Sequence, residues 1–154
     1  MPRTVHVSAP TRIDFAGGTL DIHPIYLYFN GAITVNAAID LGAQVWIRSR
    51  DDDRITIESL DTGASLAVQG TVDDLPLDGK LALITRVLRY YAPQGGFDVT
   101  TKMLPPHGSG LGASSALFVA LSHAVLAYMD KPRDAEQIIT ISNNLEAQLM
   151  GMPA

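Results

Sequence analysis

Apolar and polar residues alternate along much of the first two thirds of the chain, a pattern typical of strands with one buried face. Asp40-Leu41-Gly42 and Asp61-Thr62-Gly63 interrupt the alternation with residues that favour turns. We therefore predict two hairpins and, later in the chain, one further strand. The predicted strands cover residues 32–39, 43–48, 54–59, 65–69 and 97–103.

Helical spacing of apolar residues replaces the alternation in three segments. Residues 79–91 repeat apolar side chains along one helix face, and residues 113–128 are mostly apolar with neither proline nor glycine. Residues 133–150 follow Pro132, which suits a first helical turn. Strands that come first and helices that come later predict an α+β fold, with the helices packed on one face of the sheet.

The chain has 154 residues, of which 47% are hydrophobic and 18% charged, as expected for one globular domain over residues 1–154. Its 16 acidic and 11 basic residues give a net charge of −5, which argues against a nucleic-acid partner. The absence of cysteine excludes a disulfide framework and a thiolate metal site. The start of the chain lacks a signal-peptide core, and the longest apolar stretch, residues 116–128, is too short for a membrane span. We expect a cytoplasmic protein without a membrane partner.

The segment between the strand at 97–103 and the helix at 113–128 has the features of an anion-binding loop. Gly108, Gly110 and Gly112 permit positive φ angles and let the backbone approach a ligand closely. The free N–H groups at the start of the helix, with the positive end of its dipole behind them, favour a phosphate. The same glycines could instead only turn the chain and pack the helix against the sheet. The spacing is neither that of a P-loop nor Gly-x-Gly-x-x-Gly.

This loop resembles the second motif of the GHMP kinases, Pro-x-x-x-Gly-Leu-Gly-Ser-Ser-Ala. The chain matches the proline, the Gly-Leu-Gly core and the second serine, which is Ser114, but has Ala113 and Ser115 where the motif has serine and alanine. The resemblance implies a mixed, mostly antiparallel sheet and a site for ATP with Mg²⁺. It makes Ser114 the expected magnesium ligand and leaves Ser115 without an assigned role. The residues expected to hold the nucleotide are Pro106, Gly108, Ser109, Gly110, Leu111, Gly112, Ala113, Ser114 and Ser115.

A second resemblance lies at residues 9–22, which match the first GHMP motif. The paired glycines, Gly17 and Gly18, resemble the version found in bacterial heptose kinases. By this resemblance the two glycines leave room for a substrate, and Asp21 contacts a sugar. Asp21 could also be only a helix cap or a turn residue.

Arg12, in the same segment, is the expected catalytic residue, since a guanidinium fork suits the oxygens of a phosphoryl group. The alternative for Arg12 is a surface salt bridge. We expect Asp14 to face solvent or a neighbouring strand.

Glu146 is an acidic residue within the apolar pattern of the last helix. In the GHMP kinases a glutamate on this helix is the second protein ligand of Mg²⁺, so the resemblance pairs Glu146 with Ser114. A solvated helix residue is the alternative. The aspartate taken as catalytic base in many members follows within a few residues, and a C-terminal domain comes after it. The chain stops before both.

We therefore expect the N-terminal half of an ATP- and Mg²⁺-dependent kinase whose acceptor is a sugar or sugar phosphate, and we expect this half to be inactive alone. Two alternatives stay open. The chain could be a non-catalytic module that keeps the fold to bind a nucleotide, a sugar or another protein. It could also be a half-enzyme that forms a homodimer, or pairs with a separate C-terminal half, through exposed apolar surface.

Overall fold

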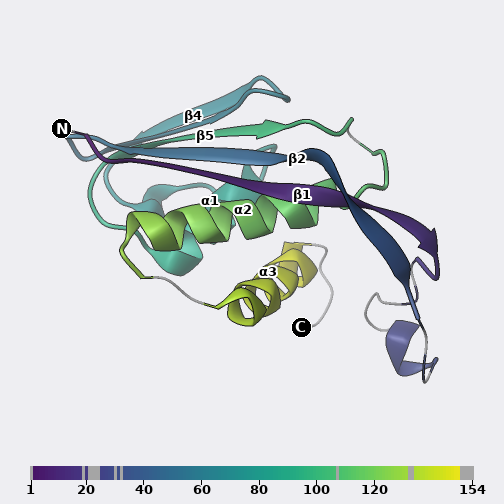
Figure 1. Cartoon of the computed structure of the whole chain (residues 1–154). Coiled ribbons are helices and arrows are strands. Elements are labelled where there is room, and N and C mark those ends of the chain that lie inside the picture. Colours follow the sequence, from purple (N-terminus) through teal and green to yellow (C-terminus); the bar gives the residue numbers. More distant parts are fainter. Residues whose placement is uncertain are drawn as a thin grey trace.

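A computed structural model describes residues 2–18, 20, 25–29, 31, 33–106, 108–131 and 134–149. Within these residues the chain forms one twisted sheet with helices packed on one of its faces (Figure 1). This arrangement confirms the predicted α+β class.

In the described part of the chain the sheet has five strands in the order β1-β2-β5-β3-β4. The pairs β1 and β2, β2 and β5, and β3 and β4 are antiparallel, whereas β3 and β5 are parallel. The sheet is therefore mixed and mostly antiparallel, as the resemblance implied. The strands are β1 (Thr4–Ala16), β2 (Val35–Ser49), β3 (Arg54–Ser59), β4 (Ala64–Gln69) and β5 (Phe97–Met103).

Alternation of side chains explains how the central strands build the core. Val45 and Ile47 of β2 are buried, and Phe97 and Val99 of the neighbouring β5 are buried on the same face. The residues between them are polar or amphipathic and point to the other face of the sheet. The predicted strand at 97–103 matches β5.

The predicted first hairpin is wrong, because residues 35–39 and 43–48 belong to one continuous strand, β2. Asp40 and Leu41 form a bulge, since the register of β2 against β1 shifts at this point. The Thr11 hydroxyl of β1 donates a hydrogen bond to the Leu41 carbonyl at 2.5 Å and holds the bulge in place.

The second predicted hairpin is confirmed, because β3 and β4 pair antiparallel along their whole length. Gly63 lies in the turn between them with a φ of 65°, a left-handed value that glycine adopts without strain.

The helices α1 (Ala82–Tyr91), α2 (Ala113–Tyr128) and α3 (Ala135–Leu149) lie on one face of the sheet (Figure 1). α2 packs on β1 and β2, and α3 packs on α2. α3 begins later than expected because the Asp134 carboxylate accepts a hydrogen bond from the Gln137 N–H at 2.9 Å, which caps the helix. Pro132 and Arg133 lie outside the described residues. Two short 3-10 helices, η1 (Ile25–Leu27) and η2 (Val72–Asp74), lie in connections.

The far ends of β1 and β2 continue past the helices and lead to η1 (Figure 1). We call this part the apolar arm, because many of its large apolar side chains are exposed: Phe15 is 69%, Ile33 75% and Tyr28 78% exposed. Exposed apolar surface of this extent is typical of an interaction site. The exposed side chains of the arm are those of Ile13, Phe15, Leu27, Tyr28, Phe29, Ile33 and Val35.

Candidate phosphate-binding site

The glycine loop connects the end of β5 to the start of α2. Gly108, Gly110 and Gly112 have φ angles of 75°, 71° and 71°, whereas Ser109 and Leu111 between them do not have positive φ. Alternation of left-handed and ordinary residues turns neighbouring N–H groups toward one side, as in the backbone nests that bind anions. The loop therefore has the backbone form that a phosphate site needs.

The start of α2 adds further donors to this loop. Its N-cap is Gly112, which provides no side-chain cap, and its first turn contains no acidic residue. The first N–H groups of a helix lack partners within the helix. Here no capping side chain takes their place, so the positive end of the helix dipole is directed at the loop and favours an anion.

β1 places Arg12 against the same loop. The Arg12 backbone N–H donates a hydrogen bond to the Leu111 carbonyl at 3.1 Å. The guanidinium lies on Gly112, because a Cβ added to this glycine would be 2.9 Å from Nη1 of Arg12. The salt bridge that was the alternative for Arg12 is also present, with Nε 3.0 Å from Oδ1 of Asp14. Asp14, expected to face solvent or a neighbouring strand, shares a face of β1 with Arg12, since residues two apart on a strand do so, and its side chain is 23% exposed.

α3 brings Glu146 to the first turn of α2. The Ser115 hydroxyl donates a hydrogen bond to Oε2 of Glu146 at 2.8 Å, and both side chains are partly buried. Ser114, the expected ligand, is exposed and is not the hydroxyl that contacts Glu146. Its metal role, and that of Glu146, stay predictions.

A carboxylate and a hydroxyl beside a phosphate loop fit the ligand preference of Mg²⁺, which takes oxygen ligands and usually keeps several waters. Among the described residues there is no group of three or more His, Asp or Glu side chains that could hold a metal. Ser115 and Glu146 are the two oxygen donors that the structure brings together beside the loop, and a metal role for them stays a prediction.

The paired glycines of the first motif lie at the base of the apolar arm. A Cβ at Gly17 would collide with the Ile33 carbonyl, and a Cβ at Gly18 would be 3.2 Å from the Cβ of Asp14. The small size of both glycines thus has a packing reason beside the predicted role in substrate binding. Asp21 lies outside the described residues, so its role stays a prediction.

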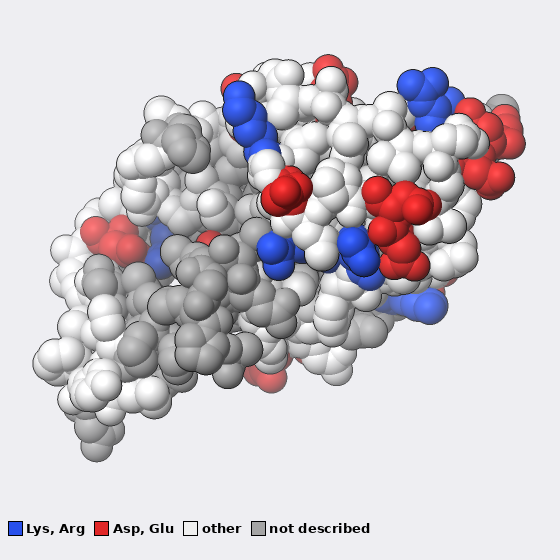
Figure 2. Space-filling model, turned by 180° about the vertical axis from the view of Figure 1, so that it is seen from behind, with Lys and Arg blue, Asp and Glu red and all other residues white. Residues whose placement is uncertain are grey.

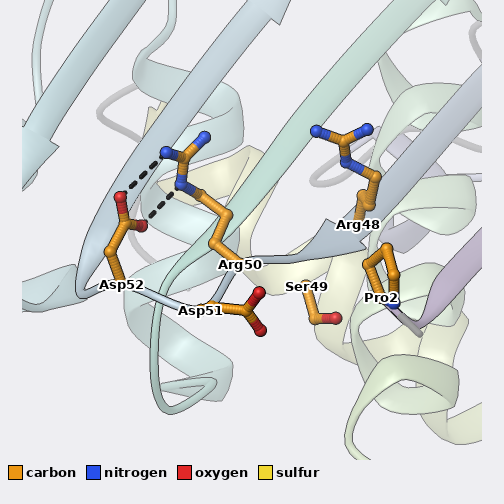
Figure 3. Close-up of a pocket in the computed structure, with 6 residues that line it drawn as sticks. All are labelled: Pro2, Arg48, Ser49, Arg50, Asp51 and Asp52. Atoms are coloured by element: carbon orange, nitrogen blue, oxygen red, sulfur yellow. Dashed lines mark hydrogen bonds and ion pairs between the residues drawn. The ribbon is translucent and has the colours of Figure 1, made fainter.

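A separate cavity of about 420 Å³ lies at the opposite end of β5 from the glycine loop (Figure 3). Sequence reasoning did not single out this region, although a run of three aspartates between two arginines signalled an ionic cluster. The cavity is lined by Pro2, Arg48, Ser49, Arg50, Asp51 and Asp52.

Arg48, Arg50 and Asp52, which line this cavity, are bound to other charged side chains of the protein. Arg50 donates to both carboxylate oxygens of Asp52, at 2.7 and 2.9 Å (Figure 3). Arg50 also donates to Asp98 at 2.8 Å. The hydrogen bonds from Arg50 lower the pKa of Asp52 to about 2. Burial raises the pKa of Asp98, but hydrogen bonds from Thr56 and Arg50 outweigh it and leave the pKa lowered. On the face shown in Figure 2, basic and acidic side chains are likewise interspersed.

The fold and the loop together define an α+β domain with a candidate phosphate-binding site between a strand and a helix. The family model described as GHMP kinases N terminal domain matches residues 81–154. D-glycero-alpha-D-manno-heptose 7-phosphate kinase of Campylobacter jejuni is 27% identical over 155 residues, which cover 97% of this chain and 45% of that protein. L-fucokinase/L-fucose-1-P guanylyltransferase of Bacteroides fragilis is 30% identical, over 84% of this chain and 16% of that protein.

Solved structures agree with these relatives. A D-glycero-D-manno-heptose 1-phosphate kinase from Bacteroides thetaiotaomicron has a TM-score of 0.84 and 28% identity, covering 99% of this chain and 50% of that one. The mevalonate kinase of Methanococcus jannaschii shares the fold, with a TM-score of 0.78 and 19% identity over 99% of this chain and 49% of that one.

The chain thus has the fold of the N-terminal domain of the GHMP kinases, and the model of that family matches its second half. It spans about half the length of the heptose-phosphate kinases that it matches. No helix among the described residues is long and apolar enough to cross a membrane.

Proposed function

We propose that this chain supplies the nucleotide-binding half of an ATP- and Mg²⁺-dependent kinase that phosphorylates a sugar or sugar phosphate in the cytoplasm. The observation that carries the proposal is the contact between the Arg12 guanidinium and the glycine loop, beside a helix start without a side-chain cap. Two relatives whose names describe heptose-phosphate kinases support the choice of acceptor.

In this proposal the N–H groups of the glycine loop bind the β- and γ-phosphates, and Arg12 stabilises the charge on the transferring phosphoryl group. Ser115 or Ser114, together with Glu146, would hold Mg²⁺, which neutralises phosphate charge when it is bound. Asp21 would bind hydroxyl groups of the acceptor. Phosphoryl transfer depends mainly on such positioning and on electrostatic stabilisation.

The proposed chemistry also needs an oriented acceptor hydroxyl, and the chain spans only about half the length of the heptose-phosphate kinases that it matches. We therefore expect that the chain by itself transfers no phosphoryl group from ATP to a sugar. A coupled assay for ADP release with heptose 7-phosphate, heptose 1-phosphate, fucose and galactose tests this. Turnover of any of them by the isolated chain would contradict the idea of an incomplete enzyme.

Nucleotide binding is tested by calorimetric titration with Mg·ATP. Gly110→Val forces a β-branched side chain onto a φ of 71° in the loop, so binding should be abolished. Gly63→Val is the matched control, because its φ of 65° gives similar strain in the turn between β3 and β4, where no atom would meet the new Cβ within 4 Å. Binding by wild type and Gly63→Val, but not by Gly110→Val, supports a retained nucleotide site. Absence of binding by the wild type favours a scaffold without nucleotide.

The apolar arm favours a second candidate, a half-enzyme that forms a homodimer or pairs with a separate C-terminal half. Light scattering after size exclusion tests the homodimer directly. If the arm mediates association, Phe15→Asp should yield monomers, whereas Leu60→Asp should not, since Leu60 is 50% exposed but lies outside the arm. A wild-type chain that stays monomeric at high concentration removes the homodimer and leaves pairing with another chain.

A further inference from the structure

Asp14 is bound to Arg12 and lies close to Gly18, two residues of the candidate site. Its Oδ1 accepts the hydrogen bond from Nε of Arg12 at 3.0 Å. A Cβ added to Gly18 would be 3.2 Å from the Cβ and 3.4 Å from Oδ2 of Asp14. The side chains of Arg12 and Asp14 are 37% and 23% exposed, so the pair lies at the protein surface without being fully solvated. Asp14 thus has both the Arg12 guanidinium and Gly18 as close neighbours.

The position of the Arg12 guanidinium needs such a partner. An arginine side chain has several rotatable bonds, so the strand fixes where the side chain starts but not where the fork points. A carboxylate bound at Nε restrains the plane of the guanidinium and leaves Nη1, which lies on the side of the fork away from the Nε–H, directed away from that carboxylate. In this structure Nη1 lies against Gly112, the N-cap of α2, where it would be 2.9 Å from an added Cβ.

We propose that Asp14 is a positioning residue that holds the Arg12 guanidinium against Gly112. The Nη groups and the N–H groups of the glycine loop then bind the same phosphate chain. This inference rests on the proposed function, since it assigns Arg12 to the nucleotide. A guanidinium that is already in place needs little reorganisation when the anion arrives, which favours both binding and phosphoryl transfer.

The negative charge of Asp14, taken by itself, would have the opposite effect on nucleotide binding. A carboxylate near an anion site repels the ligand, so by Coulomb's law its removal would strengthen binding. Two substitutions separate these effects. Asp14→Asn removes the charge but keeps an oxygen that accepts the Nε hydrogen bond, whereas Asp14→Ala removes both.

The first measurement is calorimetric titration of the full chain with Mg·ATP. Asp14→Ala should weaken binding about three- to tenfold, the cost of immobilising a long side chain at the moment of binding. Asp14→Asn should bind as tightly as the wild type or more tightly. Asp53→Ala, which removes an exposed charge in the connection between β2 and β3, is the control and should bind like the wild type. Binding by Asp14→Ala that equals or exceeds that of the wild type overturns the proposal, as does an equal loss in both Asp14 variants.

The second measurement needs no nucleotide. The Nε–Hε resonance of Arg12, assigned by its loss in Arg12→Lys, should exchange more slowly with water than that of the exposed Arg54. The protection should persist in Asp14→Asn and disappear in Asp14→Ala. An Arg12 resonance as unprotected as that of Arg54 in the wild type overturns the positioning role, even if Asp14→Ala fails to fold. A protected Arg12 in a wild type that binds no Mg·ATP shows instead that the proposed function has failed.

Discussion

The two ends of the sheet both carry an arginine bound to an aspartate, but the surroundings of the two pairs differ. At the glycine loop, Arg12 is bound to Asp14 and lies beside a helix start that has no side-chain cap. At the other end, Arg50 is bound to Asp52 and to Asp98, which also accepts a hydrogen bond from a neighbouring strand. The first end offers backbone donors to a ligand, whereas the second pairs its charges within the protein.

This difference separates a ligand site from a structural network. Charged groups that are already paired gain less from binding a further charged ligand. The lowered pKa values of Asp52 and Asp98 show that their charged forms are already stabilised within the protein. Helix-terminal N–H groups without a capping side chain remain available to an anion. An arginine–aspartate pair therefore indicates a phosphate site only where such donors lie next to it.

The largest expected effect comes from removing one arginine at each end. Arg12→Ala should weaken Mg·ATP binding about tenfold or more, because charge-assisted hydrogen bonds to a phosphate are lost. Arg50→Ala removes the same charge and should leave binding within about twofold of the wild type. Titrations at the same ionic strength compare the two. Equal weakening by both substitutions would show that net charge, and not the local site, attracts the nucleotide.

A somewhat smaller effect should distinguish the two serines of α2. Ser115 contacts Glu146 and Ser114 is exposed, so Ser115→Ala should reduce the dependence of ATP binding on Mg²⁺ more than Ser114→Ala does. Glu146→Gln should act like Ser115→Ala, with a loss of about tenfold in Mg²⁺-dependent affinity, because a charged oxygen ligand is replaced by a neutral one. Titrating ATP with and without Mg²⁺ measures this dependence. A larger effect of Ser114→Ala would restore Ser114 as the ligand that its motif position implies.

The elements set by local pattern could be predicted from the sequence. The strand at β5 and the helix at α2 have the bounds that alternation and helical composition predicted, because neighbours in the chain decide both. The bulge at Asp40 and Leu41 could not be predicted, since turns and bulges use the same residue types and only pairing with Thr11, far away in sequence, decides between them.

The features of the candidate site likewise divide into those that local sequence predicts and those that depend on how distant elements pack. The glycine loop was found from its sequence, because glycines before a helix are a local signal. The contact between Ser115 and Glu146 depends on how α3 is rotated against α2, which no local pattern specifies. The contact between Arg12 and Asp14 could have been predicted, since alternation places residues two apart on the same face of a strand.

A further prediction concerns why the loop ends in glycine. Gly112→Ala and Gly108→Ala place a Cβ at similar φ angles, 71° and 75°, but only the first Cβ would meet Arg12. Each should lower the free energy of unfolding by about 1–2 kcal/mol through the left-handed backbone. Gly112→Ala should also weaken Mg·ATP binding several-fold more than Gly108→Ala does, and this excess should disappear when Arg12→Ala is added. If Gly112→Ala still weakens Mg·ATP binding more than Gly108→Ala does when Arg12→Ala is present, the Arg12 guanidinium is not the reason that position 112 needs glycine.

The smallest expected effect is a change in acid stability at the other end of the sheet. The pKa of Asp52 falls from 3.8 to about 2 on folding, and that of Asp98 is also lowered. A carboxylate whose pKa is lowered by folding stabilises the fold at pH values above its unfolded pKa. This stabilisation is lost as the pH falls through the folded pKa, so the contribution of Asp52 disappears between pH 3.8 and about pH 2. Arg50→Gln should therefore be less stable than the wild type near neutral pH, and the difference should shrink as the pH falls toward about 2. Solvent screening keeps the difference small. Urea unfolding at a series of pH values measures it, and a difference that stays constant down to the lowest pH would mean that Arg50 stabilises this end of the sheet through packing instead of through its carboxylates.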